Sequence, residues 1–515
     1  MRHLLFLLTV IQAFQCLNAQ NLQKIGHLPY APLTLAGCWH HVDQNGGEWA
    51  LVGNSAGLSI VDVSNPTQPT ERFTVPGLPN NWREVRTWKG YAYVVSEATS
   101  SAVTIVNLNL LPDTVIWKVW TGDGPFEGKV VSNHAVQVAD ETLYLFGGDD
   151  VALGTVILSL EDPWNPEIKG ITDEFYVHDG FIRGDTLWTN EGNLSQIGVY
   201  DVTDKSTPTL ITRFPHQPGY SHNSELSADG KILFVSVETS NQPLASFDVS
   251  NLDDIRLLDL YKPSRKPSGE VHNVRIMPGN LLVCPSYRGQ LTVVDASRPG
   301  NMIEIAWDSL GNSLVWDADP YLPSGIILAT AKSEGLYIYQ TNYQHAAWLE
   351  GLVTDQFSGA PLANAKVFVL NTPNADSTLA NGEYQTGAAQ SGTYVVRVER
   401  EGYETQVHSN IALSSGIVTT KNFALKPLII KTEQPDFDHS VDVSPIPFSS
   451  YLQITVPDHL PTSGWQLCSL KGEILRKFPS QTSNLIRIEN LDHLPNGTYL
   501  LQNIQSGMSL KVVKH

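Results

Sequence analysis

Residues 57–66 read Gly57-Leu58-Ser59-Ile60-Val61-Asp62-Val63-Ser64-Asn65-Pro66, a short apolar run followed by an acid and an Asn-Pro pair. β-branched side chains favour a strand, and Asn-Pro favours a turn after it. Related stretches follow at intervals of roughly 40 to 50 residues, the period of a propeller blade. They begin at Val103, Val156, Ile197, Leu244, Leu291 and Leu336. Seven copies predict a β-propeller with one blade for each copy.

The two ends of this array predict how the ring of blades closes. A further strand follows the Pro-containing turn in other copies, as at residues 208–213, but none follows the last copy at Tyr339. Residues 22–28, which precede the first copy, look like such an outermost strand. We expect residues 22–28 to pair beside residues 336–339, because this pairing completes the seventh blade and removes an exposed sheet edge.

The acid that ends several of the apolar runs is predicted to organise its own turn. An Asp side chain before Ser or Thr commonly bonds the backbone two residues on. We therefore give these acids a structural role. They are Asp62, Asp201, Asp248 and Asp295.

Composition excludes two classes of partner. The chain of 515 residues carries a net charge of −19, so we expect an acidic surface. Nucleic acid and anionic membrane surfaces both need basic patches, and neither is an expected partner. The cysteines are scattered and form no CxxC pair, which excludes a cysteine-bound metal. They are Cys16, Cys38, Cys284 and Cys468.

Residues 1–19 have the pattern of a secretory signal peptide. Arg2 supplies the positive start, and residues 4–11 form an apolar core too short to span a bilayer. Ala19 is an acceptable cleavage position, with Gln20 as the first mature residue. Cys16 leaves a lipoprotein as an alternative, although the large residues before it are unlike a lipobox. No later run is apolar enough for a transmembrane segment, so we expect an exported protein.

After a predicted propeller at residues 20–345, the pattern changes at residues 348–425. Residues 351–355 read Gly-Leu-Val-Thr-Asp, and residues 392–398 read Gly-Thr-Tyr-Val-Val-Arg-Val. This segment resembles the carboxypeptidase regulatory-like domain, a small transthyretin-like β-sandwich. The resemblance implies a spacer or stability module without peptidase chemistry, and the segment contains no His/Glu zinc motif.

A polar linker is predicted at residues 426–439, followed by a terminal domain at residues 440–515. Residues 494–500 read Leu-Pro-Asn-Gly-Thr-Tyr-Leu, and residues 511–514 read Lys-Val-Val-Lys. The order of these motifs resembles the C-terminal sorting domain of the type IX secretion system of Bacteroidota. That resemblance implies the type IX machinery as a partner. It also implies a protein that is secreted or held at the outer-membrane cell surface.

The repeats themselves resemble the LVIVD repeat. Together with the leader and the tail, they resemble the choice-of-anchor B family, whose members share the propeller and differ in their C-terminal attachment. The family implies no established reaction. The fold class expected for the whole chain is all-β, with a seven-bladed β-propeller followed by two small β-sandwich domains.

One polar position recurs in the first strand of the predicted blades. Five of the 15 histidines fall into this register. Further acids lie near the ends of the second strands. The first set is His41, Glu84, His134, His178, His222 and His272, with Trp316 at the same position of the last blade, and the second set includes Glu97, Glu191 and Glu238.

These two sets have two interpretations. Imidazoles and carboxylates converging at one mouth of the channel could hold a divalent metal, or bind an anionic or sugar ligand. Alternatively, each histidine bonds the backbone of a neighbouring blade and is structural. We find no nucleophile elbow, phosphate loop or dinucleotide motif, and assign no catalytic residue.

Two functions therefore compete. The first is a secreted or surface-attached propeller that binds an extracellular glycan or protein. The second is a metal-dependent, lactonase-like hydrolase that uses the His/Glu ring. Bound metal in the purified protein discriminates between them.

Overall fold

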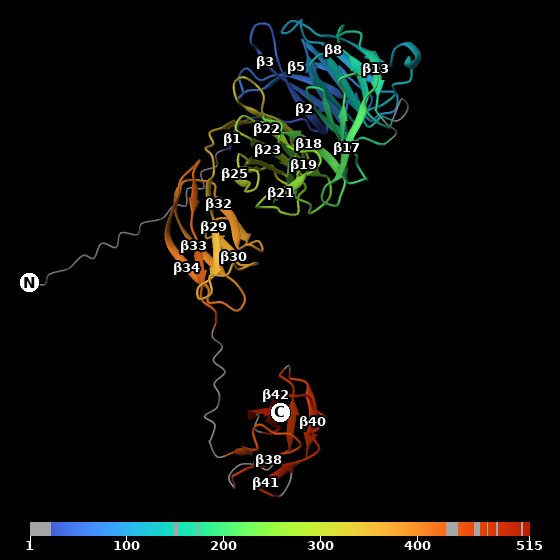
Figure 1. The fold of residues 1–515 in the computed structure, drawn as a ribbon. Helices are drawn as coiled ribbons and strands as arrows, with labels where there is room; N and C mark the ends of the chain where they lie inside the picture. Colours follow the sequence, from blue (N-terminus) through green and yellow to red (C-terminus); the bar gives the residue numbers. More distant parts are fainter. Residues whose placement is uncertain are drawn as a thin grey trace, which may run out of the picture. The chain divides into compact units, whose positions relative to one another are not determined.

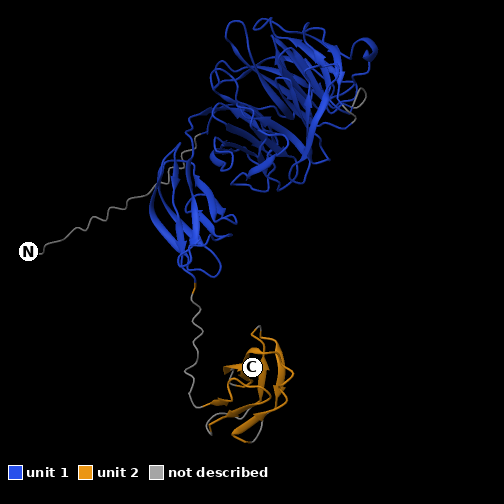
Figure 2. Ribbon diagram, in the orientation of Figure 1, with its two compact units in different colours: residues 1–427 blue, residues 428–515 orange. Residues whose placement is uncertain are grey.

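The computed structural model describes residues 22–148, 153–172, 175–428, 441–457, 464–470, 472–479, 483–505 and 508–515. The chain forms two compact units, residues 1–427 and residues 428–515 (Figure 2). The predicted signal peptide at residues 1–19 and residues 429–439 of the predicted linker lie outside the described residues. No helix in the described ranges is long and apolar enough to cross a membrane.

Unit 1 begins with seven four-stranded antiparallel sheets, which are the blades of the predicted β-propeller (Figure 1). In blades 1 to 6 the four strands pair in chain order from the first to the fourth. Blade 1 has β2 (Leu35–Val42), β3 (Glu48–Asn54), β4 (Gly57–Asp62) and β5 (Thr70–Pro76); blade 2 has β6 (Arg83–Trp88), β7 (Tyr91–Ser96), β8 (Val103–Asn107) and β9 (Ile116–Trp120); blade 3 has β10 (Ala135–Ala139), β11 (Thr142–Phe146), β12 (Val156–Ser159) and β13 (Glu167–Ile171). The 3₁₀-helix η1 (Gly124–Phe126) lies between blades 2 and 3.

The remaining blades have the same plan. Blade 4 has β14 (Asp179–Arg183), β15 (Thr186–Asn190), β16 (Gln196–Asp201) and β17 (Thr209–Pro215); blade 5 has β18 (Ser221–Leu226), β19 (Ile232–Val237), β20 (Leu244–Asp248) and β21 (Arg256–Tyr261); blade 6 has β22 (Arg275–Met277), β23 (Leu281–Ser286), β24 (Gln290–Asp295) and β25 (Ile303–Ser309); blade 7 has β26 (Val315–Asp319), β27 (Ile327–Ala331), β28 (Gly335–Thr341) and β1 (Leu22–Leu28).

The seventh blade confirms the predicted closure. Strand β1 pairs antiparallel with β28, with Leu22 opposite Thr341 and Leu28 opposite Leu336. Leu22 is buried in the apolar core that blades 6 and 7 share. The N-terminal strand therefore covers the edge that the last repeat would otherwise expose.

The acids at the ends of the third strands organise turns, as predicted. The Oδ1 atom of Asp62 accepts a hydrogen bond from the backbone N–H of Ser64 at 3.0 Å. Asp201, Asp248 and Asp295 make the same contact two residues on, at 2.8 to 3.0 Å. These side chains stabilise the turn that leads to each fourth strand.

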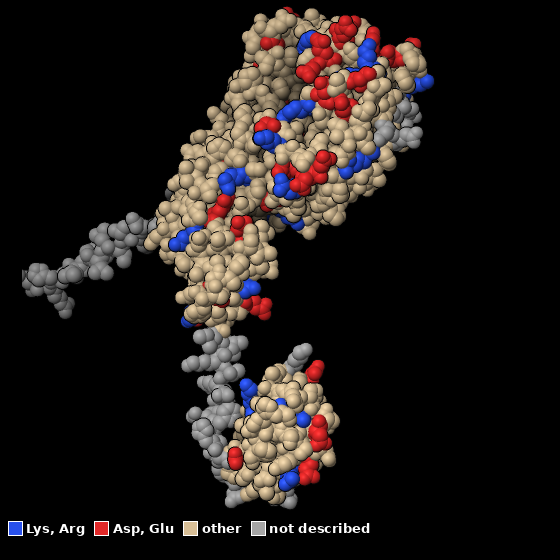
Figure 3. Space-filling view, in the orientation of Figure 1, with Lys and Arg blue, Asp and Glu red and all other residues tan. Residues whose placement is uncertain are grey.

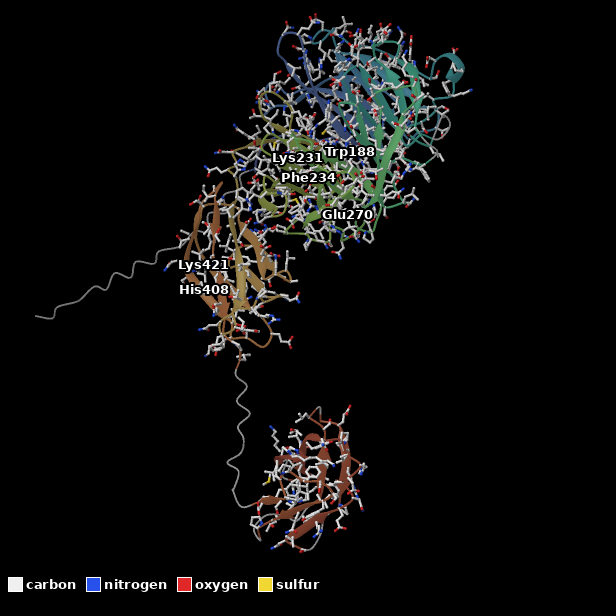
Figure 4. All side chains as sticks on the ribbon, viewed as in Figure 1. Trp188, Lys231, Phe234, Glu270, His408 and Lys421 are labelled. Atoms are coloured by element: carbon white, nitrogen blue, oxygen red, sulfur yellow. The ribbon has the colours of Figure 1, made fainter. Side chains whose placement is uncertain are left out.

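Apolar cores lie between successive blades, since alternate side chains of each strand face opposite neighbours. Figure 4 labels two aromatic members, Trp188 of β15 and Phe234 of β19, both buried. On the surface, Figure 3 shows acidic and basic side chains interspersed on the visible face of unit 1. That face carries no extended basic area, in keeping with the net charge of −19.

Unit 1 ends in a small β-sandwich of two sheets around one apolar core. Trp348, in its first strand, donates its indole N–H to the carbonyl of Asn301 in blade 6 at 3.2 Å. Arg298 binds Glu350 with two hydrogen bonds of 2.9 and 2.7 Å. One sheet contains β29 (Ala347–Asp355), β32 (Glu383–Ala388), β35 (Val418–Thr420) and β36 (Phe423–Leu425); the other contains β30 (Lys366–Val369), β31 (Ala375–Ser377), β33 (Gly392–Glu399) and β34 (Gln406–Leu413).

Unit 2 is a second β-sandwich with its own core, in which Trp465 is 1% exposed. The strand ending in Lys514 pairs antiparallel with the strand beginning at Gly497. One sheet contains β37 (Asp442–Ser444), β38 (Leu452–Thr455) and β41 (Leu485–Ile488); the other contains β39 (Trp465–Cys468), β40 (Ile474–Phe478), β42 (Gly497–Asn503) and β43 (Ser509–Lys514).

Candidate functional site

Four of the five predicted histidines lie next to one another, within or just before the innermost strands of successive blades. Ring centroids are 4.0 Å apart for His134 and His178, and 4.5 Å apart for His178 and His222. His272 lies 4.1 Å from His222, and Trp316 of the last blade lies 4.6 Å from His272. The sequence register therefore identified a real row of side chains that crosses blades 3 to 7.

Glu84 of blade 2 completes this row. The indole N–H of Trp316 donates to Oε1 of Glu84 at 3.1 Å, across the position of blade 1. Blade 1 contributes Gly37 there, and a Cβ atom on Gly37 would lie only 2.4 Å from Oε2 of Glu84. We call His134, His178, His222, His272, Trp316 and Glu84 the histidine ring. The seventh position, in blade 1, is Gly37. The Glu84 carboxylate fills the space that a side chain there would occupy.

The structure does not bring His41 into the histidine ring. His41 pairs with Trp49 near the far end of β2, four residues beyond Gly37. In blade 7, Trp316 lies at a register shift between Val315 and Asp317. The corresponding shift in blade 1 falls between Leu35 and Cys38, which makes Gly37 the equivalent residue. The predicted register was wrong in this blade because β2 begins at Leu35, well before the expected strand.

Glu191 also lies away from the ring. Its carboxylate accepts a hydrogen bond from Nε of Arg213 at 2.9 Å and is fully buried. Gln196 donates to the same carboxylate. Arg213 belongs to the fourth strand β17, so this acid supports its own blade.

Glu97 and Glu238 do reach the ring. Glu97 lies 2.5 Å from Nδ1 of His134, and Glu238 lies 3.8 Å from Nε2 of His222. Tyr287 donates its hydroxyl hydrogen to Glu238 at 2.8 Å and stacks on His272 at 4.6 Å. Both predicted carboxylates therefore flank imidazoles.

The outer part of this site adds a cation and aromatic rings. Nζ of Lys332 lies 4.5 Å from the ring centre of Trp316 and 4.9 Å from that of Trp82. Trp82 is 38% exposed, so part of its indole faces solvent. Lys332 and Trp82 were not predicted as site residues, because they share no spacing in the sequence. Tyr287 occupies the same second-strand position as Glu97, Glu191 and Glu238. Trp316 did occupy the predicted register.

Hydrogen bonds define which nitrogen of the inner imidazoles carries the proton. Nδ1 of His178 lies 3.2 Å from the carbonyl of His222, and Nδ1 of His272 lies 2.5 Å from the carbonyl of Trp316. A carbonyl only accepts, so in both rings Nδ1 donates and Nε2 keeps its lone pair. The backbone bonding expected of structural histidines therefore occurs, but it uses one nitrogen of each ring.

One buried ring nitrogen remains without a partner. Nε2 of His272 forms no hydrogen bond to any described residue, whereas His222 bonds the backbone of His272. Buried polar atoms are normally satisfied by protein, water or a ligand. The ring thus retains hydrogen-bonding or metal-ligating capacity that the protein itself does not use.

Burial keeps three of the imidazoles neutral. It lowers the pKa of His178, His222 and His272 well below 6.5, and neighbouring imidazoles lower it further. Burial also lowers the pKa of His134, but the hydrogen bond and charge of Glu97 outweigh it, so that pKa is raised. Burial and Asp317 raise the pKa of Glu84 to about 7. Neutral imidazoles are the form that binds a metal ion.

The spacing of these groups is compatible with a cation. One ligand atom each from His134, His178 and His222 lies within 4.8 Å of the others, and the same holds for His222, Glu238 and His272. Bonds of about 2.0–2.1 Å to zinc place tetrahedral ligands roughly 3.3 Å apart. A small contraction of either trio could therefore form a site.

Comparison with protein families identifies two segments. A model of the LVIVD repeat matches residues 46–76, which include β4 of blade 1. A model of the carboxypeptidase regulatory-like domain matches residues 349–426. The chain is therefore a β-propeller protein that contains an LVIVD repeat and a carboxypeptidase regulatory-like domain. A search of curated proteins found no match.

Proposed function

We propose that this protein is an exported β-propeller that binds an extracellular ligand at the histidine ring. The observation that carries the proposal is the buried, unpartnered Nε2 of His272. A ring built only for packing would leave this atom unsatisfied at a cost of about 1–3 kcal/mol. A ligand that reaches it removes this cost.

The surroundings of the ring suit a sugar or a peptide. Trp82 and Tyr287 offer partly exposed aromatic surfaces, and Lys332, Glu97 and Glu238 lie close to them. Aromatic rings beside hydrogen-bonding groups combine apolar contact with orientation of a polar ligand. An extracellular glycan or protein segment meets both requirements.

The proposed cellular location of the protein rests on its N-terminal and C-terminal segments. Residues 1–19 support export, and the motifs at residues 494–500 and 511–514 support a sorting domain read by the type IX machinery. With the propeller, these features support membership of the choice-of-anchor B family. The protein would then be secreted or attached at the outer-membrane surface.

A metal-dependent hydrolase is the second candidate, and the two ligand trios favour it. A divalent ion held by His222, His272 and Glu238 would supply a Lewis acid and lower the pKa of bound water. The hydrogen bond from Nδ1 of His272 to the backbone would orient that ring, as supporting groups do in metal sites. We assign no catalytic base.

Metal analysis of untagged protein separates the two candidates. After dialysis against zinc and then metal-free buffer, about one equivalent of retained metal in the wild type, lost in His272→Ala, supports the metal site. His493→Ala, a change at an exposed histidine of unit 2, serves as the control. Metal-free protein that still binds a glycan or peptide array at Trp82 supports the binding function alone. Absence of both metal and array binding would refute a role for the ring.

A further inference from the structure

A second set of side chains lies three residues beyond the histidine ring on the same innermost strands. Three residues of strand span about 10 Å, so this set forms a separate layer. Most of its members line one cavity of about 620 Å³, a size suited to a small ligand. The set is His40, Thr87, Gln137, Phe181, Glu225, Arg275 and Asp319.

The walls of the cavity combine aromatic rings and guanidinium groups. Trp39, Phe181 and Tyr321 line it together with Arg86, Arg183 and Arg275. The guanidinium of Arg86 lies 4.1 Å from the ring centre of Trp39, and that of Arg183 lies 5.3 Å from the ring centre of Phe181. We call this space the arginine-lined cavity.

The acceptor groups of the cavity are already used. Glu225 accepts from Nη1 of Arg275 at 3.4 Å, and also from the backbone N–H of Ile276 at 2.9 Å. The hydroxyl of Tyr321 donates to the same carboxylate at 3.3 Å. Oε1 of Gln137 accepts from Nε of Arg86 at 3.0 Å. A ligand that only donates hydrogen bonds would therefore find few free acceptors.

Several hydrogen-bond donors of the cavity, in contrast, have no acceptor among the described residues. Arg275 is 2% exposed, and its Nε forms no hydrogen bond to a described residue. Nη1 of Arg86 donates to the carbonyl of Val85, and Nη1 and Nη2 of Arg183 donate to the carbonyls of Ser227 and Leu226. Within the described ranges these contacts leave Nη2 of Arg86, Nε of Arg183 and Nε2 of Gln137 as donors without a recorded acceptor.

Acidic side chains lie close to two of the three guanidinium groups of the cavity. Arg275 is balanced by Asp317 at 2.9 Å and by Glu225. Arg86 lies 3.7 Å from Glu84, whose pKa burial raises to about 7, and it also interacts with Glu225. Arg183 makes its described hydrogen bonds to backbone carbonyls. Carboxylates therefore oppose the guanidiniums of the cavity, and its unpartnered donors, rather than a net positive charge, select the ligand.

We propose that the arginine-lined cavity binds an organic carboxylate whose body is a ring or an apolar group. The carboxylate oxygens accept from the Arg86 and Gln137 donors, and the body packs against Trp39 and Phe181. Guanidinium groups match carboxylates in geometry and charge, and aromatic walls match a flat body. This site is independent of the histidine ring.

Calorimetry with paired probes tests the proposal. Benzoate and glucuronate are titrated into the full chain beside their uncharged counterparts, benzamide and glucose, and beside inorganic phosphate. We expect at least one acid to bind in a 1:1 complex and about tenfold or more tighter than its neutral counterpart, because only the acid places negative charge beside the guanidiniums. Equal binding of acid and neutral probe, or tightest binding of phosphate, would overturn the proposal.

Two variants locate the site without removing a buried arginine. Gln137→Glu is nearly isosteric, keeps a partner for Arg86 and sets a like charge against the ligand, so affinity should fall about tenfold or more. Arg183→Gln, at an exposed position, should weaken binding by a smaller factor. Gln23→Glu adds the same charge at an exposed position of β1 and should leave affinity unchanged. Unchanged binding by Gln137→Glu, or loss of acid binding on chelation of metal, would refute the assignment.

Discussion

The carboxylate of Glu84 occupies the space that a side chain at Gly37 would need. The Oε2 atom lies 2.4 Å from the position of a Cβ on Gly37, and Oε1 accepts the indole hydrogen of Trp316. Blade 1 thus contributes no side chain to the ring, and Glu84 of blade 2 contacts Trp316 of blade 7 directly. The contacts therefore run from His134 through Trp316 to Glu84, and six of the seven blades contribute a side chain.

Gly37→Ala should break this bridge. The methyl group must displace Glu84, so we expect a loss of about 1–3 kcal/mol in unfolding free energy, as for overpacked cores. Thermal and urea unfolding measure it. Gly300→Ala is the matched control, because its Cβ would meet only Gln385 at 3.4 Å, an ordinary contact. Equal stability of the two variants would contradict the close approach of Glu84.

Acid should destabilise the propeller through the histidine ring. The pKa values of His178, His222 and His272 are lowered in the folded state, so below about pH 6.5 the unfolded chain binds more protons. Stability then falls as the pH drops from 6.5 toward the folded values, by up to about 1.4 kcal/mol per pH unit for each group. Urea unfolding between pH 7.5 and 5.5 measures the slope.

The contribution of His134 to the pH dependence of stability has the opposite sign, because Glu97 raises the pKa of His134. Its contribution is present below pH 6.5 and is lost as the pH rises through the folded value. His272→Gln should reduce the acid slope, whereas Glu97→Gln should steepen it by removing the stabilised charge on His134. The wild-type slope also contains Glu84, whose raised pKa of about 7 stabilises the folded chain as the pH falls. An unchanged pH dependence of stability in His272→Gln would therefore contradict the neutral state of this inner ring.

Removal of residues 21–30 should open the ring of blades. The deletion takes away β1, which pairs with β28 and buries Leu22. The exposed edge and apolar surface should cause self-association, visible by light scattering after size exclusion. A chain truncated after residue 427 keeps β1 and should remain dispersed. A monomeric deletion variant with unchanged stability would show that closure contributes little.

Removal of residues 426–515 should block delivery to the cell surface. If the terminal motifs are a sorting signal, this truncation should accumulate in the periplasm while its propeller stays folded. Cell fractionation with a protease-resistance assay distinguishes trapping from misfolding. Normal surface display of the truncated chain would refute the sorting assignment.

The blade count, the closing strand and the turn acids could be read from the sequence because they depend on local patterns. Apolar runs at a regular period define third strands, and an acid before Ser or Thr defines a turn. Four ring histidines could be placed for the same reason, since their blades have similar lengths. His41 could not, because β2 begins at Leu35, well before the expected strand, and Gly37 takes the ring position.

Tertiary structure decided the rest. A shift in strand pairing changes which residue stands at a given position of the sheet. In blade 1 such a shift lies between Leu35 and Cys38. The partner of Glu191 lies on β17, and the gap at Gly37 is filled from another blade. The arginine-lined cavity likewise joins residues from several innermost strands. The sequence alone determined which strands exist, and the packing of blades determined which side chains meet, because those contacts join residues that no local spacing relates.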